Sequence, residues 1–200
     1  MENLKNWSRS DSRTERMERT LAQRQPGLVV VLENVHDPHN LGAILRSCDA
    51  TGVSRVMMVY YIESPPEIGK TSASGALKWL NFERYRSIGS CYDVLRKEGF
   101  QILATKIEPE AKQLYDFDLS VPTAIVLGNE HRGISKEAAD GADGLLYIPM
   151  KGMVESVNVS VAAAICLFEA MRQRQEKGMY DGPQLSEEIM RSKLQEWIKI

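Results

Sequence analysis

The most informative segment of this 200-residue chain is Ile148-Pro149-Met150-Lys151-Gly152-Met153-Val154-Glu155-Ser156-Val157-Asn158-Val159-Ser160. It follows an apolar run that predicts a buried strand, passes through a loop marked by proline and glycine, and enters a helix of small and β-branched residues. α/β proteins place ligands at such strand–loop–helix junctions, beyond the carboxyl ends of their strands. An ordinary helix cap at Ser156 or Asn158 explains the segment equally well by itself.

Length and composition limit the possibilities. The chain has room for one ordinary domain, and a hydrophobic content of 43% is enough for a sizeable core. No apolar run approaches the length of a membrane span, and residues 1–20 are too polar for a signal peptide. Cys48, Cys91 and Cys166 are widely spaced, which argues against a disulfide scaffold and against zinc, so we expect a cytoplasmic protein. Because the formal net charge is only -2, a nucleic-acid partner would need local basic patches.

Strand-like and helix-like patterns alternate along the chain. Strands are expected at residues 28–33, 55–61, 79–85, 100–105, 122–127 and 144–148, and helices at 41–51, 71–78, 88–97, 135–139 and 159–174. Several of these strands are apolar on both faces. The combination predicts an α/β fold, with a mostly parallel sheet and helices on both of its faces.

The two ends of the chain differ from its middle. Residues 1–26 are polar and rich in arginine, with Met17 and Leu21 as an apolar pair, so we expect a basic helical arm. The arm is either a solvated surface helix or a segment that contacts phosphate. Residues 27–175 form the expected main domain, and residues 176–200 a helical tail that is either docked or frayed. The basic residues of the arm are Lys5, Arg9, Arg13, Arg16, Arg19 and Arg24.

A second informative segment runs from Asn40 to Arg46. A buried strand delivers Asn40 to a loop, and Arg46 follows about one and a half helical turns later, so both side chains can face one site. A guanidinium grips phosphate with two hydrogen bonds, which suits a contact to RNA or substrate. A surface ion pair with Asp49 or Glu33 is the simpler alternative.

The third segment, Leu127-Gly128-Asn129-Glu130-His131-Arg132-Gly133-Ile134, follows another expected strand. Its two glycines allow the backbone to approach a ligand closely, although a plain turn also explains them. The pattern is neither GxGxxG nor a P-loop, so the usual dinucleotide and triphosphate sites have no support. All three segments follow strands of one sheet and can converge at its carboxyl edge, which is stronger evidence for a ligand site than any single loop.

Together the segments resemble the three motifs of the SPOUT (SpoU-type) RNA ribose 2′-O-methyltransferases, in order from about Arg16 to Tyr180. The resemblance implies a deep C-terminal trefoil knot, which general rules of chain topology disfavour. It also implies a homodimer formed through the long terminal helices, with Ile165, Leu167 and Phe168 supplying apolar surface. The flanking residues are most similar to the branch that methylates guanosine 18 in the D loop of tRNA; they are Gln23-Arg24-Gln25-Pro26, His36-Asp37-Pro38-His39-Asn40, Met171-Arg172-Gln173-Arg174-Gln175 and Gly178-Met179-Tyr180.

The resemblance further implies a cofactor, S-adenosyl-L-methionine, a tRNA substrate and no metal. By position, the cofactor-binding residues would be Thr105, Gly128, Asn129, Glu130, Ile148, Met150 and Val157. The catalytic residues would be Arg46, Asn40, Glu130, Ser156 and Asn158. The RNA-binding residues would be Arg16, Arg24, His39, Lys106, Arg172 and Arg174. Arg46 matches the residue proposed as the base in this family, but guanidinium groups keep their proton at neutral pH, so orienting the ribose or stabilising the oxyanion is the alternative.

Other functions stay open on the sequence. Methylation of ribosomal RNA, or of the tRNA wobble nucleotide, would keep the same fold and chemistry; wobble enzymes of this superfamily usually lack an arginine-bearing arm, which favours guanosine 18. A non-catalytic RNA-binding protein would keep the fold alone, and the joint presence of the five catalytic candidates argues against it. A nucleotide-binding oxidoreductase lacks its glycine-rich fingerprint here.

Overall fold

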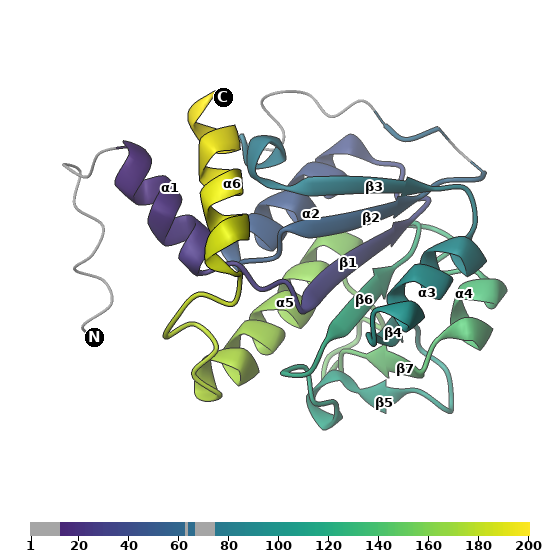
Figure 1. Cartoon of the computed structure of the whole chain (residues 1–200). Helices are drawn as coiled ribbons and strands as arrows, with labels where there is room; N and C mark the ends of the chain where they lie inside the picture. The colour runs from purple at the N-terminus through teal and green to yellow at the C-terminus, as the bar shows by residue number, and fades with distance from the viewer. Residues whose placement is uncertain (1–12, 63, 67–74) are drawn as a thin grey trace.

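The described part of the chain is built on a seven-stranded sheet whose neighbouring strands are all parallel (Figure 1). The structure is a computed structural model, and it describes residues 13–62, 64–66 and 75–200. Across the sheet the strands follow the order β3-β2-β1-β6-β4-β7-β5. Their bounds are β1 Leu28–Glu33, β2 Arg55–Val59, β3 Asn81–Tyr85, β4 Gln101–Thr105, β5 Lys112–Gln113, β6 Thr123–Leu127 and β7 Gly144–Tyr147.

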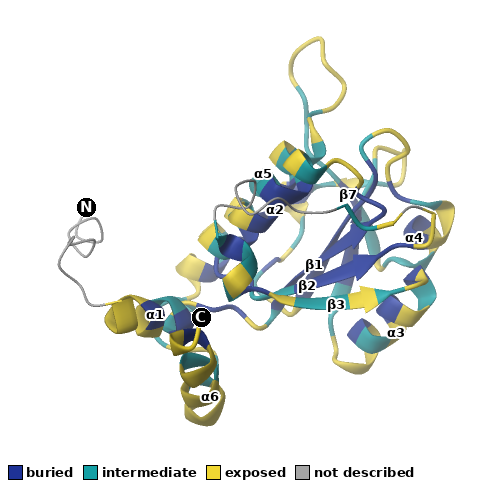
Figure 2. Ribbon diagram, turned by 90° about the horizontal axis from the view of Figure 1, so that it is seen from above, coloured by how far each residue is buried: buried dark blue, intermediate teal, exposed yellow. Residues whose placement is uncertain are grey.

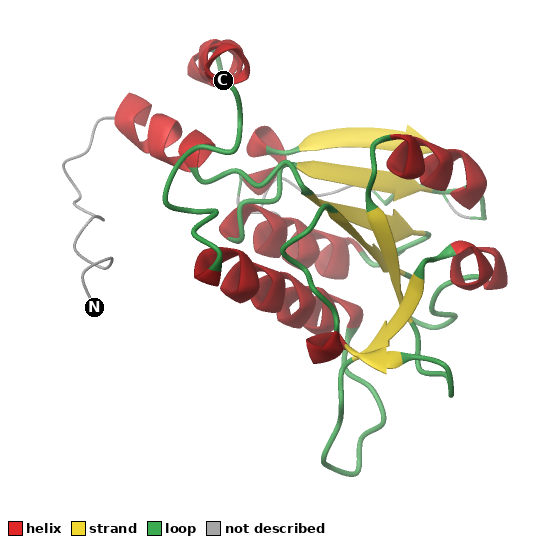
Figure 3. Cartoon of the chain, turned by 60° about the horizontal axis from the view of Figure 1, so that its bottom comes forward, coloured by secondary structure: helices red, strands yellow, loops and turns green. Residues whose placement is uncertain are grey.

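Helices cover both faces of this sheet, as the sequence predicts (Figures 1 and 3). On one face α2 (Pro38–Ala50) and α5 (Val159–Glu176) pack against each other and over the sheet. On the other face lie α3 (Ile88–Lys97) and α4 (Lys136–Gly141). The described residues also form two short 3-10 helices, η2 (Ala76–Trp79) and η3 (Leu114–Asp116).

Strand β1 shows why the apolar runs of the sequence are uninterrupted. Leu28, Val30 and Leu32 enter the core under α2 and α5, while Val29 and Val31 enter the core under α3 and α4. All five side chains are fully buried. A central parallel strand has no solvent-facing side and therefore needs apolar residues at successive positions. The predicted α/β class is confirmed.

The two terminal helices form a separate pair beside the sheet (Figure 2). Helix α1 (Arg13–Ala22) and helix α6 (Glu187–Ile198) pack together through Met17, Leu21 and Trp197, all of which are buried. The Trp197 ring also meets Trp79 edge-on, with 4.9 Å between ring centroids. The tail therefore ends in a docked helix rather than a frayed one. Residues 1–12 of the expected arm, with Lys5 and Arg9, lie outside the described residues.

Some elements differ from expectation for local reasons. Helix α2 begins at Pro38, three residues early, because the Asp37 carboxylate caps it by accepting from the backbone N–H of His39 at 2.7 Å. Strand β5 has two residues, too few to produce a periodic signal. In the helix expected at 71–78, residues 71–74 lie outside the described residues and the 3-10 turn η2 follows them. None of the helices in the described part of the chain is long and apolar enough to cross a membrane.

Candidate active site

A cavity of about 330 Å³ opens at the carboxyl edge of the sheet, where the loops that follow β4, β6 and β7 meet. All seven residues predicted to bind a cofactor lie in its wall; they are Thr105, Gly128, Asn129, Glu130, Ile148, Met150 and Val157. Ser156 lies there too. The volume lies within the range of about 300–1,000 Å³ that is typical of small-molecule sites. The structure thus brings these residues together, and their contacts to a ligand stay a prediction.

The loop after β6 is closed on itself. Asn129 and Gly133 exchange two backbone hydrogen bonds, of 3.0 and 2.8 Å. The Asn129 side chain, 6% exposed, donates to the carbonyl oxygen of Asn34 at 2.8 Å and accepts from the N–H groups of His131 and Arg132. A Cβ atom at Gly128 would lie only 2.1 Å from the carbonyl carbon of Gly133. Gly128 is therefore required for the loop to close, rather than for a turn alone.

Glu130 ties this loop to the start of α2. Its carboxylate accepts from the backbone N–H of His36 at 3.1 Å, from that of Asp37 at 3.0 Å and from Nδ2 of Asn40 at 3.2 Å. Burial alone would raise the pKa of Glu130, but the hydrogen bonds from backbone N–H groups and from Asn40 outweigh it and lower the pKa. The carboxylate is consequently ionised at neutral pH and is held by neutral donors.

Asn40 links the three segments that the sequence singled out. Its Nδ2 donates to Glu130, and its Oδ1 accepts from Nδ2 of Asn158 at 2.9 Å. Asn158 is also the N-cap of α5, because its Oδ1 accepts from the backbone N–H of Ser160 at 2.8 Å. The simpler interpretation of Asn158 as a cap is thus correct, and the same amide also reaches Asn40. The loop between β7 and α5 stands away from the body of the protein (Figures 2 and 3).

Arg46 lies exposed on α2, six residues after Asn40, and is not part of the cavity wall. The two carboxylates considered as its partners make other contacts. Asp49 accepts from Arg24 at 2.6 Å. Glu33 is 1% exposed and accepts from the Tyr61 hydroxyl at 2.6 Å and from the Ser135 N–H at 2.8 Å.

Sequence reasoning missed two residues that frame the site. Asn34, at the end of β1, has a positive φ of 51° and uses its side-chain oxygen to accept from the N–H groups of Tyr61 and Ile62. The Glu33 carboxylate accepts a hydrogen bond from the backbone N–H of Ser135, the N-cap residue of α4. An asparagine directly after a buried strand is a weak signal for a left-handed residue, and no local pattern indicates Glu33.

Burial argues against two of the predicted RNA contacts. Arg24 is 1% exposed and donates to the Val53 carbonyl and to Asp49. Arg174 is 0% exposed and donates to three backbone carbonyls, of Leu119, Gly27 and Val121, at 2.7 to 3.0 Å. Both guanidinium groups satisfy interior acceptors and have no surface to offer to RNA. Burial lowers the pKa of Arg174, yet the group stays far from titration at neutral pH.

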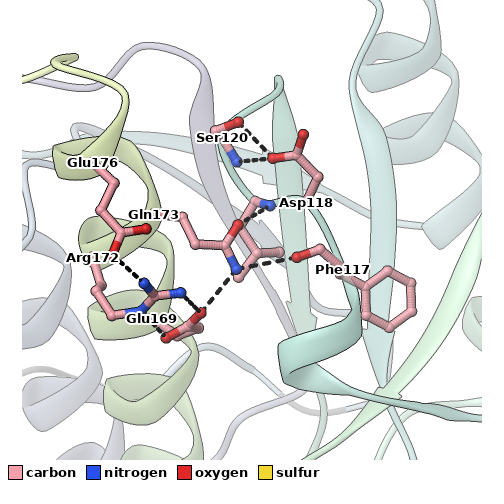
Figure 4. Close-up of polar contacts among 8 residues, drawn as sticks. Phe117, Asp118, Ser120, Glu169, Arg172, Gln173 and Glu176 are labelled. Carbon is pink, nitrogen blue, oxygen red and sulfur yellow. Dashed lines mark hydrogen bonds and ion pairs between the residues drawn. The ribbon is translucent and has the colours of Figure 1, made fainter.

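The other RNA-binding candidates reach the surface. Arg172 is exposed, but its guanidinium bonds the carboxylates of Glu169 at 2.8 Å and Glu176 at 2.6 Å along α5 (Figure 4). Gln173, beside it, joins α5 to the backbone of Phe117 and Leu119. The remaining candidates, Arg16, His39 and Lys106, are exposed or half-buried. Within the described ranges there is no group of three or more His, Cys, Asp or Glu side chains that could hold a metal ion.

Comparison with known proteins decides the family. A model of the SpoU rRNA Methylase family matches residues 27–168, which contain the whole sheet and the cavity. The chain belongs to the SpoU family. A second model, described as "SpoU, rRNA methylase, C-terminal", matches residues 172–198, from the end of α5 to α6.

Among SpoU proteins, the chain is 44% identical over 191 residues to the tRNA (guanosine(18)-2'-O)-methyltransferase of Thermus thermophilus. This alignment covers 96% of this chain and 98% of that protein. The crystal structure of the A. aeolicus TrmH/SpoU tRNA modifying enzyme superimposes with a TM-score of 0.88 at 39% identity and covers 94% of this chain and 95% of that one. The SpoU methyltransferase AviRb from Streptomyces viridochromogenes, solved in complex with the cofactor AdoMet, is 28% identical with a TM-score of 0.66, and covers 78% and 62% of the two chains.

Proposed function

We infer that this SpoU protein transfers a methyl group from S-adenosyl-L-methionine to the ribose 2′-oxygen of guanosine 18 in tRNA. The observation that carries this inference is the near-complete alignment with the Thermus thermophilus guanosine-18 enzyme, which covers 96% of this chain and 98% of that protein. Relatives that act on ribosomal RNA match a shorter part of the chain, 75% in one case.

The cavity suits the proposed cofactor chemically. Its wall combines apolar side chains, among them Leu127, Ile134 and Leu146, with the backbone of three loops. Such a wall can hold a nucleoside and an aliphatic amino acid through apolar contact and backbone hydrogen bonds. When bound, S-adenosylmethionine supplies an electrophilic methyl group on a sulfonium. The residues proposed to hold it are the seven cavity-wall positions predicted from the sequence.

The polar network beside the cavity is proposed to position the ribose. Asn40, Glu130 and Asn158 form a continuous chain of hydrogen bonds, which links the start of α2, the loop after β6 and the start of α5. Ser156, in the cavity wall, is proposed to contact the ribose hydroxyl or the cofactor. Arg46 is proposed to orient the ribose and stabilise the developing oxyanion, because a guanidinium keeps its proton at neutral pH.

Homodimer formation through α5 is a further proposal. Val161 and Phe168 of α5 are 45% and 47% exposed, which leaves apolar area for a second copy. Leu167, predicted to share this surface, is fully buried in the monomer core and is excluded from it, while Ile165 packs partly against that core. A V161D/F168D double substitution is expected to convert a dimer to a monomer in light-scattering measurements. A monomeric wild-type protein would contradict the proposal.

The domain division and the knot are proposed as well. The proposed division is an arm at 1–26, a methyltransferase domain at 27–175 and a helical tail at 176–200. For the trefoil knot, the support is the family resemblance, and the strand order is compatible with it, since β7 follows β6 in sequence but lies beyond β4. An experimental density map traced continuously from residue 105 to residue 165 tests it.

The decisive experiment is methyl incorporation from labelled S-adenosylmethionine into unmodified tRNA, mapped by nucleotide digestion. A 2′-O-methylguanosine at position 18 is expected. Methylation at the wobble position or in ribosomal RNA alone would keep the chemistry and overturn the substrate. Cofactor binding without incorporation into any RNA would favour a non-catalytic RNA-binding protein.

The role of Arg46 is tested separately. The R46A variant is expected to lose methyl transfer while its affinity for the cofactor, measured by calorimetry, stays near that of the wild type, because Arg46 lies outside the cavity wall. A parallel loss of cofactor affinity would remove Arg46 from the proposed catalytic role.

A further inference from the structure

The mouth of the cavity carries charges that the proposed function does not yet use. Lys106 and Ile107 follow β4, and Arg132 lies in the loop that follows β6; all three lie in the cavity wall. Arg132 is exposed, and its backbone N–H is held by Asn129 at 3.2 Å, so the position of its Cα is fixed by the loop. Two cationic residues from two different loops therefore border one opening.

Lys106 already forms an ion pair with a carboxylate. Glu108 forms an ion pair with Lys106, with 2.6 Å between Oε1 and Nζ. Both side chains are partly exposed, 38% for Glu108 and 29% for Lys106. Glu108 thus lies beside a cation of the mouth rather than on a remote surface.

The substrate chemistry places an anion at this mouth. In RNA, the 2′-oxygen and the 3′-phosphate are attached to neighbouring ribose carbons. A ribose whose 2′-oxygen reaches the cavity therefore brings its own 3′-phosphate to the opening. Lysine and arginine are the side chains that bind such phosphates, arginine with two parallel hydrogen bonds.

We propose that Lys106 and Arg132 bind the backbone phosphate next to the methylated ribose, and that Glu108 occupies Lys106 until this phosphate displaces it. Arg132 is not among the RNA-binding residues that the family resemblance implies. Glu108 acts as an internal competitor of the RNA. The proposal rests on the proposed function, because it requires an RNA substrate at this cavity.

The carboxylate of an amino-acid cofactor is the other anion that these cations could bind. Exposure favours phosphate, because Arg132 faces the solvent from which a polyanion arrives, while the cavity interior is lined by apolar side chains. The two anions predict different measurements, since one changes the affinity for tRNA and the other changes the affinity for the cofactor.

The test compares three variants of the full chain: R132Q, E108Q and the control K97Q. Lys97 ends α3, next to the amino end of β4 and therefore at the opposite edge of the sheet from the cavity. Binding of unmodified tRNA is measured at several salt concentrations, and binding of S-adenosylmethionine is measured by calorimetry. Wild-type methyl transfer to the same tRNA is measured in parallel.

The expected results have opposite signs. R132Q binds tRNA about tenfold more weakly at low salt, and the slope of log K against log[salt] falls by about 0.7–0.9. E108Q binds tRNA about two- to fivefold more tightly, because a partly exposed ion pair no longer competes. K97Q changes neither quantity, and the affinity for the cofactor stays within twofold in all three variants.

Two results would overturn the proposal. One is a weaker affinity of R132Q for the cofactor with an unchanged tRNA slope, which would assign Arg132 to the cofactor carboxylate. The other is an E108Q variant that binds tRNA no more tightly than the wild type. If the wild type methylates tRNA while either result is found, only this inference fails; if the wild type methylates no tRNA, the proposed function fails first.

Discussion

The hydrogen-bonded junction at Asn40 provides the sharpest functional prediction. Asn40→Ala removes the donor to Glu130 at 3.2 Å and the acceptor for Asn158 at 2.9 Å in one step. A hydrogen bond to a charged group is worth about 1.5–3 kcal/mol when buried, and roughly 1–2 kcal/mol at a half-buried position such as this one. The neutral bond to the exposed Asn158 adds about 0.5 kcal/mol.

If this free energy is expressed in the transition state, the sum of about 1.5–2.5 kcal/mol lowers kcat/KM for tRNA by about 10- to 60-fold. The assay is steady-state methyl transfer with labelled S-adenosylmethionine, with thermal unfolding as a check on the fold. Ser47→Ala is the matched control, because Ser47 lies on the same helix and its hydroxyl bonds only within α2, to the Ala43 carbonyl at 3.1 Å. Its activity should stay within twofold of the wild type.

Asn40→Asp adds a negative charge while it keeps nearly the shape of the asparagine side chain. It places a second carboxylate against Glu130, and two charges about 4 Å apart repel by about 4 kcal/mol at an effective dielectric constant of 20. At pH 8 the N40D variant should therefore lose at least another tenfold relative to N40A. Like charges raise the pKa of the pair, so the ratio of N40D to wild-type activity should rise as the pH falls and the pair takes up a proton. An N40A variant within twofold of the wild type, or an N40D variant as active as N40A at pH 8, would refute this reasoning.

Four further predictions rest on the geometry of the loops and on burial. Gly128→Ala should abolish cofactor binding in calorimetry with the far-UV spectrum retained, because its Cβ would lie 2.1 Å from Gly133; retained affinity would show that the loop adapts. The pKa of Glu130 is lowered in the folded protein, so its stabilisation of the loop should be fully present at and above neutral pH and lost only as the pH falls through the lowered value. Cofactor affinity should therefore not depend on the titration of Glu130 between about pH 8 and 5.5. A loss of cofactor affinity centred near pH 6 would contradict this assignment. Arg174→Met should reduce the free energy of unfolding in urea by about 3 kcal/mol or more, because three backbone carbonyls lose their donor, and leave the salt dependence of tRNA binding unchanged. Arg16→Gln should leave the free energy of unfolding unchanged and reduce the salt dependence of tRNA binding. Equal losses of stability in the Arg174 and Arg16 variants would contradict the distinction between a buried and an exposed arginine.

Much of the architecture follows from local sequence patterns. The apolar runs and the 3.6-residue periodicity predict the alternation of strands and helices, because side chains buried on both faces of a strand leave an unbroken apolar signature. Helix α3 begins and ends at the residues expected, since Ser87 caps it and Gly99 follows it with a positive φ. The chemistry of the loops was equally visible, because glycine and asparagine after strands are local features of the chain.

Convergence of the site belongs to tertiary structure. The sequence shows Asn40, Glu130 and Asn158 as members of three separate loops, and their hydrogen bonds span 90 and 118 residues. Strand order brings these loops together, because β1, β6, β4 and β7 lie side by side and release their loops at one edge. The framing role of Glu33 depends on the same neighbourhood, since its partners are Tyr61 and Ser135.

The arginines show what a local sequence pattern predicts and what depends on the tertiary structure. Arg16, Arg24 and Arg174 look alike in a sequence, as basic residues with helical spacing, and all three were predicted to contact RNA. Arg174 is buried because carbonyl oxygens from residues 27, 119 and 121 converge on its guanidinium, and Arg24 is buried because Asp49 and Val53 accept its hydrogens under the Trp197 ring. The sequence by itself determined that the chain carries an arginine-rich arm and three glycine- or asparagine-bearing loops that follow strands. Only the tertiary structure decided which arginines are buried against interior acceptors and which lie at the surface, because a charge can be buried only where distant acceptors meet it.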